Sequence, residues 1–381
     1  MKGITCIVAI ALFAGIVSCG SGKKSGLPVV DVTRSYPEKA LVFQDIAEVE
    51  YIPLETTDDF LVQNTPLYIG EEYIIIHEYK LGTILAFDRK TGKAVNRIGR
   101  AGSGPGEYTE YLRSLTMDRE TGIIYVFDPG NGNKILTYDI DGKFLGEFTT
   151  AGNYYYMLDY DGEYLLCADL HTGRGQPFVL VSKKDGSETT EITIPIAERR
   201  IFEIVTPNLR LRYPLPSSIL RNGKEFILTE FTSDTIYRFN PENRSLTPAI
   251  LRYPPIDNME IPYYLYPTGF TGDYIFVNYI KQDAQMTEQG AVSIPGDQLV
   301  FDRKSGEVYK QHIVNADYDR GRPYSLSGTN GDFPAGVVVY MLTALELADA
   351  YEAGKLSGKL EEIASGLKED DNPVLMIVKF K

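Results

Sequence analysis

A repeated pair of β-strands is the feature that most constrains the fold of this chain. In each copy an apolar strand is followed by a second strand that ends in Asp or Asn and then by a tight turn, as in residues 124–128 and 135–139. The residues that end the second strand recur about every 50 positions, at Asp88, Asp139, Asp185, Asn240 and Asp302. A period of this length that contains only strands is typical of a β-propeller, in which each repeat forms one four-stranded antiparallel blade.

The strands can be grouped into six blades. Five complete sets of four strands are predicted between residues 67 and 314. Gly and Asn residues in the short turns supply the positive φ that tight hairpins need. The sixth blade has three predicted strands, at 324–327, 336–342 and 374–380, and lacks a fourth.

A segment before the first blade supplies the missing strand. Residues 49–54 alternate polar and apolar side chains and belong to no other blade. We predict that they form the outermost strand of blade six, where Pro53 is tolerated because no further strand pairs with it. This pairing would close the ring and remove open sheet edges. The predicted fold is therefore all-β, a six-bladed β-propeller over residues 29–381 with its ring closed by an N-terminal strand in the last blade.

A short helical insertion interrupts blade six. Between about residues 342 and 368, apolar residues recur at helical spacing, and Gly354 separates two predicted helices. These apolar stripes favour packing onto the propeller, and the alternative is a helix that binds a partner.

The N-terminus has the pattern of a bacterial lipoprotein signal. Lys2 precedes an apolar run that is too short to span a bilayer, and small residues then precede Cys19. We therefore predict a signal peptide over residues 1–18, acylation of Cys19, and a flexible tether over residues 19–28. An ordinary signal peptide with a chance Cys is the alternative. Gly20 after the Cys disfavours retention in the inner membrane, so the outer membrane is the expected location.

Charge and cysteine content exclude other classes of protein. The chain has a formal net charge of -14, which argues against a nucleic-acid partner because such a partner needs a basic face. Beyond Cys6 and Cys19 there is only Cys167, which lies in an apolar strand. An internal disulfide is therefore not expected, and Cys167 is interpreted as a small buried apolar residue. We expect a monomer.

Four stretches of the chain resemble a known family. They are the segment ending at Cys19, residues 45–56, residues 102–108 and residues 367–375. The segment Gly102-Ser-Gly-Pro-Gly-Glu-Tyr108 and the strands that follow it also resemble the NHL type of propeller repeat. The whole chain is similar to the six-bladed β-propeller lipoproteins of Bacteroidetes bacteria. This resemblance implies a propeller fold and lipid anchoring in the cell envelope, and it implies no chemistry.

The sequence contains no evident catalytic set. His77, His171 and His312 are far apart and lack metal-ligand spacing. The densest group of oxygen ligands lies in the repeat of blade two, and it is interpreted either as ordinary turn capping or as a calcium site. Its members are Asp128, Asn131, Asn133, Asp139 and Asp141.

The predicted loops differ between the two faces of the propeller. The turns between the first and second, and between the third and fourth, strands of each blade are short. The remaining connections lie on the opposite face and include long segments, such as 196–216 and 280–297. We call this the long-loop face. Long loops on a rigid scaffold are where binding usually resides. This face carries the candidate ligand-binding residues Arg100, Arg113, Arg174, Arg210, Arg212, Tyr213, Tyr263, Tyr264, Arg320 and Arg322.

Arg and Tyr together are the composition of a recognition surface, and Arg forms paired hydrogen bonds with carboxylates. The alternative is that these arginines pair with nearby acids. The predicted function is a lipid-anchored, non-catalytic binding module of the cell envelope that holds a glycan, peptide or protein ligand without a cofactor. One alternative is a calcium-dependent hydrolase or lyase of the lactonase type that uses Glu107, Asp128 and Glu230. Another is a structural or signalling partner that docks through the helices at 342–367.

Overall fold

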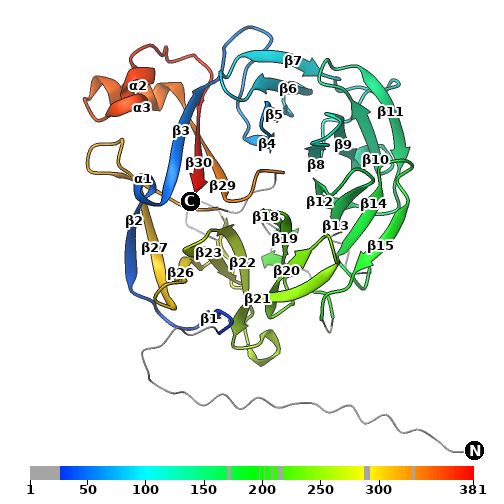
Figure 1. Cartoon of the computed structure of the whole chain (residues 1–381), viewed down its shortest axis with the longest axis vertical. Coiled ribbons are helices and arrows are strands. Elements are labelled where there is room, and N and C mark those ends of the chain that lie inside the picture. The colour runs from blue at the N-terminus through cyan, green and yellow to red at the C-terminus, as the bar shows by residue number, and fades with distance from the viewer. Residues whose placement is uncertain are drawn as a thin grey trace, which may run out of the picture.

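The blades stand around a central axis in the computed structural model, as Figure 1 shows. The structure describes residues 26–169, 173–196, 198–200, 202–206, 209–212, 218–286, 292–327 and 331–381. Blades one to five each contain four antiparallel strands, and in each blade the first strand in sequence lies nearest the axis. This arrangement confirms the predicted six-bladed β-propeller.

The strands of these blades follow the chain in order. Blade one contains β4 (Pro66–Ile69), β5 (Tyr73–Glu78), β6 (Thr83–Asp88) and β7 (Ala94–Ile98). Blade two contains β8 (Ser114–Met117), β9 (Ile124–Asp128), β10 (Lys134–Tyr138) and β11 (Phe144–Thr149), with a 3-10 turn η1 (Pro129–Asn131). Blade three contains β12 (Tyr154–Asp159), β13 (Tyr164–Asp169), β14 (Phe178–Ser182) and β15 (Glu188–Ile192). Blade four contains β18 (Ile219–Asn222), β19 (Glu225–Leu228), β20 (Thr235–Asn240) and β21 (Ser245–Tyr253), followed by η2 (Ile256–Asn258). Blade five contains β22 (Tyr263–Phe270), β23 (Tyr274–Lys281), β26 (Gly296–Asp302) and β27 (Glu307–Asn315).

Blade six joins the two ends of the chain. Its strands are β29 (Val337–Leu342), β30 (Val374–Phe380) and β3 (Ala47–Pro53). β3 pairs antiparallel with β30, with Tyr51 opposite Met376. The predicted closure of the ring by an N-terminal strand in the last blade is therefore confirmed.

The innermost part of blade six differs from the prediction. The expected inner strand at 324–327 does not form there, because β28 (Arg322–Tyr324) folds back on β27 in blade five. A hairpin between neighbouring segments closes a shorter loop, which costs less conformational entropy than joining a new blade. The segment 331–333 instead lies beside β4 of blade one, where the Asp332 N–H donates to the Leu67 carbonyl at 2.8 Å. The ring is therefore closed near the axis by segment 331–333 beside β4, and farther out by β3 in blade six.

The N-terminal segment runs along the outer edges of three blades. β1 (Val29–Asp31) adds parallel to β21 of blade four, and β2 (Glu38–Val42) adds parallel to β27 of blade five. After the short helix α1 (Phe43–Ile46), the chain continues into β3 of blade six, and Figure 1 shows this path at the rim. The added strands cover sheet edges that would otherwise be open.

The core lies between the blades. Side chains alternate across a strand, so one strand serves two layers of core. In β5, Ile74 and Ile76 pack toward blade six with Ile377, whereas Ile75 packs toward blade two with Val126. Cys167 is fully buried in one such layer, as predicted, and burial raises the pKa of its thiol.

The helical insertion packs onto the propeller. Helices α2 (Ala344–Glu352) and α3 (Gly358–Ala364) connect β29 to β30. The Thr343 hydroxyl accepts a hydrogen bond from the Glu346 N–H and caps α2. Leu347 and Leu360 are buried in the core of blades five and six. Among the described residues, no helix is both long and apolar enough to cross a membrane.

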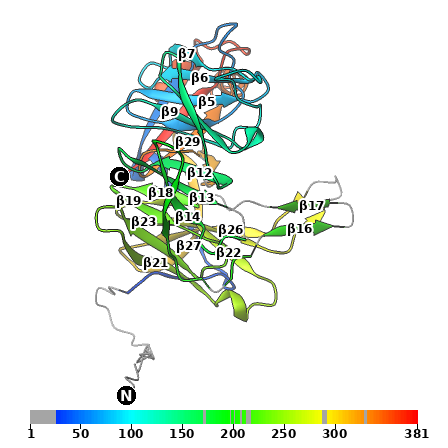
Figure 2. The ribbon, with the colours of Figure 1, turned by 90° about the vertical axis from the view of Figure 1, so that its right-hand side faces the viewer.

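The long-loop face carries two small hairpins. One consists of β16 (Glu203–Thr206) and β17 (Leu209–Arg212), and Figure 2, in which the propeller is seen edge-on, shows it projecting from one face. The other consists of β24 (Gln285–Met286) and β25 (Val292–Ser293). Aromatic residues of neighbouring loops and strands, including Phe202, Phe231 and Tyr264, form a small core beneath this face.

Candidate functional site

A buried carboxylate lies at the centre of the ring. The side chain of Asp332 has no exposed surface, and it accepts hydrogen bonds from the Thr116 hydroxyl at 2.6 Å and from Arg221 Nη2 at 2.9 Å. Arg119 Nη2 donates to the same carboxylate at 3.2 Å. Burial opposes ionisation of Asp332, but the ion pairs with Arg221 and Arg119 outweigh it and hold the pKa below its ordinary value.

A second group of charged residues adjoins Asp332. Lys183, which is almost fully buried, donates to Asp159 at 2.7 Å and also to Asp118. Burial raises the pKa of Asp159, although Lys183 lies beside it. We call the six residues of these two groups the axial network: Asp118, Arg119, Asp159, Lys183, Arg221 and Asp332. Asp118 and Asp159 share Lys183, and Asp332 pairs with both arginines, so every carboxylate of the network lies beside a cation.

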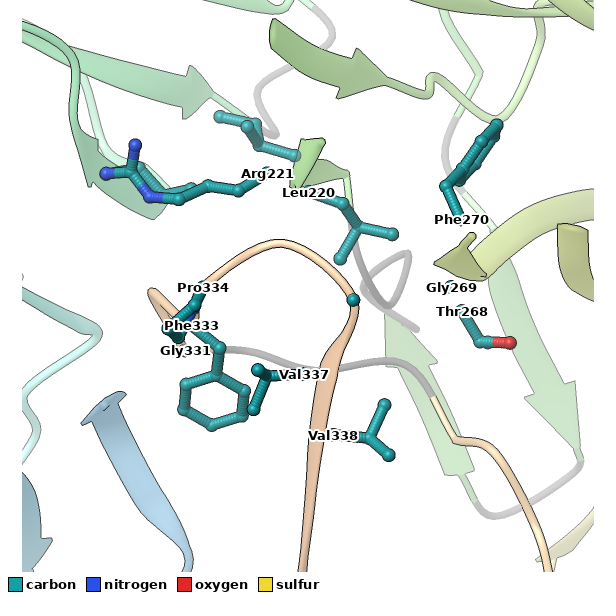
Figure 3. Close-up of a pocket in the computed structure, with 13 residues that line it drawn as sticks. Leu220, Arg221, Thr268, Gly269, Phe270, Gly331, Phe333, Pro334, Val337 and Val338 are labelled. Atoms are coloured by element: carbon teal, nitrogen blue, oxygen red, sulfur yellow. The ribbon is translucent and has the colours of Figure 1, made fainter. Parts of the chain in front are cut away.

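The axis next to this network is packed with apolar side chains. A cavity of about 20 Å³ lies between β18, β22, β29 and the segment 331–334, with Leu220, Phe333 and Val337 among its lining residues. Figure 3 shows these side chains around it. Such a volume holds about one water molecule. This cavity is therefore too small for a ligand larger than a water molecule.

Most of the predicted arginines on the long-loop face lie beside acids. Arg174 donates to both carboxylate oxygens of Glu188, at 2.7 and 2.6 Å, and is largely buried. Arg322 lies 3.3 Å from Glu346, between the rings of Tyr318 and Tyr324. The others in acidic contact are Arg100 with Glu107, Arg210 with Glu203 and Arg320 with Asp319. These residues belong to different blades and do not form one cluster.

The predicted tyrosines differ in their surroundings. Tyr264 is buried, and its hydroxyl donates to Gln282 at 2.6 Å. Its ring packs with Phe202 and Phe231 in the small core beneath the loops. Tyr263 is partly buried and packs against the ring of Tyr279 and the ammonium group of Lys281. Tyr213 and Cys19 lie outside the described residues, as does the side chain of Arg212.

Arg113 has a different environment from the other arginines. It is exposed, directly precedes the innermost strand β8, and lies with its guanidinium 5.0 Å from the centre of the Tyr155 ring. In the described part of the chain its side chain makes no ion pair. An Arg that is stacked on an aromatic ring retains its hydrogen-bond donors for another group.

The carboxylates considered for a calcium site accept hydrogen bonds from nearby loops of the protein. Asp128 accepts hydrogen bonds from the Thr109 N–H at 2.7 Å and from the Thr109 hydroxyl at 2.6 Å. Glu107 accepts from the Gly104 N–H at 2.7 Å, and Glu230 accepts from the Thr232 N–H at 2.8 Å. Among the described residues, no three His, Cys, Asp or Glu side chains are grouped so that they could hold one metal ion. These contacts give the carboxylates structural roles in their loops.

The axial network was missed by reasoning from the sequence. Its members come from β12, β18, the turns after β8 and β14, and the segment 331–333. The one local signal is a charged residue at or just after the end of an innermost strand, as at Asp118, Asp159 and Arg221.

The fold is a six-bladed β-propeller with long loops on one face and a buried charged network beside its axis. The chain belongs to the family described as Domain of unknown function (DUF4934), whose model matches residues 27–379. None of the curated proteins matches it.

Solved structures of other proteins resemble this chain to different degrees. A candidate exported protein from Bacteroides fragilis is 21% identical, with a TM-score of 0.61, and the match covers 90% of this chain and 100% of that one. BamB from Moraxella catarrhalis is 12% identical with a TM-score of 0.31, over 81% of this chain and 82% of that one. The extracellular domain of a hybrid two-component system from B. thetaiotaomicron is 12% identical with a TM-score of 0.38, over 78% of this chain and 45% of that one. At 21% identity the first similarity shows the fold.

Proposed function

We propose that this protein is a lipid-anchored, non-catalytic binding module of the outer membrane that acts as a monomer. The lipid anchor is Cys19, and the long-loop face holds a glycan, peptide or protein ligand. The lipoprotein pattern at residues 1–19 supports the anchor, and the description of the Bacteroides fragilis structure as a candidate exported protein is consistent with export.

The environment of Arg113 carries the proposal for the site. Its guanidinium is exposed, is oriented by the Tyr155 ring at 5.0 Å, and has no acidic partner among the described residues. In a chain with a net charge of -14, an unpaired cation on a loop face favours a ligand that carries a carboxylate. Aromatic and Arg side chains near the centre of a surface are the usual origin of binding energy.

Calorimetric titration of the protein with oligogalacturonates and with Glu-rich peptides tests this site. We expect binding by at least one of these probes, and Arg113→Ala should weaken it at least tenfold, because one charge-assisted hydrogen bond contributes about 1.5–3 kcal/mol. Arg113→Lys should recover only part of the loss, since Lys lacks the planar donors of Arg.

Arg320→Ala is the matched control, because Arg320 is also exposed on a loop of this face but lies beside Asp319. Its affinity should equal that of the unmodified protein. Equal loss in both variants, or unchanged binding in Arg113→Ala, would remove Arg113 from the site. Tyr264 is unsuitable for this test because it is buried and its substitution would disturb the loops.

A further inference from the structure

A polar hollow of about 450 Å³ lies at the opposite end of the axis from Arg113. It is formed by the turn between β4 and β5 in blade one and the turn between β8 and β9 in blade two. Its lining includes Tyr68, Glu71, Glu72, Tyr73, Arg119 and Glu120. Sites for small molecules in proteins have volumes of about 300–1,000 Å³, so this hollow is large enough for one.

The hydroxyl of Tyr68 is an unused polar group in this hollow. Tyr68 is 3% exposed, and its hydroxyl makes no hydrogen bond to any residue that the structure describes. Burial raises the pKa of this phenol to about 12, so it carries its proton at neutral pH and is able to donate it in a hydrogen bond. Although most of the Tyr68 side chain is buried, its hydroxyl is accessible, so a ligand in the hollow can accept its hydrogen bond.

Arg119 brings further donors to the same place. Its guanidinium lies 5.8 Å from the centre of the Tyr68 ring, and Nη2 donates to Asp332 at 3.2 Å. A guanidinium has five N–H donors, and the other donors of Arg119 have no partner among the described residues. The side chain is 32% exposed, so these donors are accessible from the hollow.

Three carboxylates of the hollow are also unused, whereas Asp118, which lines it too, accepts hydrogen bonds from Lys183 and from the N–H groups of its own turn. The carboxylates of Glu71, Glu72 and Glu120 make no ion pair or hydrogen bond within the described part of the chain. Acids in other turns on this face behave differently, since Asp88 and Asp302 both accept hydrogen bonds from the N–H groups of their own turns. The described residues also hold no grouping of three such side chains around one point that could bind a metal ion.

We infer that this hollow binds a sugar that carries no carboxylate, at a second site on the face opposite the long loops. Each sugar hydroxyl both donates and accepts, and the hollow offers carboxylate acceptors together with donors from Tyr68 and Arg119. The excess of carboxylates disfavours anionic ligands. Arg113 directly precedes β8, whereas the hollow includes the turn that follows β8, so the two sites lie at opposite ends of this strand.

Saturation-transfer NMR with cellobiose, maltose, N,N′-diacetylchitobiose, digalacturonate and spermidine tests this inference. We expect at least one of the three uncharged disaccharides to bind and digalacturonate to give no signal that depends on the hollow. Tyr68→Phe and Glu72→Gln should each weaken the sugar about tenfold, while urea unfolding shows that both variants remain folded. The matched control is Glu260→Gln, an exposed acid on the other face, which should bind as the unmodified protein does.

Three results would overturn the inference. One is the absence of a signal from all three uncharged disaccharides, and another is a signal that survives both Tyr68→Phe and Glu72→Gln. The third is binding of spermidine alone, which would assign the hollow to a cation. Sugar binding that persists in Arg113→Ala supports a separate site and does not depend on the proposed function.

Discussion

Asp332 shows how one residue can connect distant parts of the ring. Its carboxylate lies between Thr116 of blade two and Arg221 of blade four, while its backbone pairs with β4 of blade one. Removing one member of a buried ion pair leaves the other charge without compensation, which typically costs about 3–5 kcal/mol. We therefore expect Asp332→Ala to lower the free energy of unfolding by about that amount at pH 7, measured by urea denaturation.

The same variant has a predictable pH dependence. The folded protein holds the pKa of Asp332 below that of the unfolded chain, which is about 3.9. The stabilisation by this carboxylate is therefore fully present well above pH 4 and is lost as the pH falls through the lower, folded-state pKa. The difference between the two proteins should shrink in acid. The control is Arg320→Ala, an exposed residue whose substitution should change the free energy of unfolding by no more than about 0.5 kcal/mol. A change equally small in Asp332→Ala at pH 7 would contradict the role of Asp332.

At the scale of elements, β3 contributes more to the ring and its core than β1 and β2 do. β1 and β2 add to blades that already have four strands, whereas β3 is the third strand of blade six. Ile52 of β3 is buried with Leu375 and Ile377 in the core between blades six and one. Removing β3 would open both the ring and this core.

Two truncated chains test this difference. A chain that begins at residue 43 lacks β1 and β2, and we expect it to unfold cooperatively at a lower urea concentration than the full chain. A chain that begins at residue 54 also lacks β3, and it should lose the cooperative transition when followed by circular dichroism. Equal cooperativity of the two chains would mean that the contacts of segment 331–333 with β4 are sufficient to close the ring.

At the scale of the whole molecule, the proposed lipid anchor would place the propeller at a membrane. Cys19 lies outside the described residues, and its acylation is a proposal from the sequence. Cys19→Ser should move the protein from the membrane fraction to the soluble fraction and abolish palmitate labelling, because a stable anchor needs its acyl chains. Substitution of the buried Cys167 by Ala is the control and should leave the protein with the membranes. Membrane association of Cys19→Ser equal to that of the unmodified protein would contradict the anchor.

The sequence alone determined the repeat, the number of blades and the strand that closes the ring. These follow from local signals, since the two-residue alternation of strands and the turns at Asp88, Asp139 and Asp302 are each visible within a few positions. The prediction of an inner strand at 324–327 was wrong because β28 pairs with its neighbour β27, a choice between two partners that the alternation does not resolve.

Only the tertiary structure decided which charged residues meet. The closure brings Asp332 to Thr116 and Arg221, which are more than 100 positions away along the chain. Arg113 and Arg174 look alike in sequence, yet one lies over a ring and the other is held by Glu188. Contacts across the axis depend on how several blades pack around one centre. The spacing of residues within a single blade does not predict this packing.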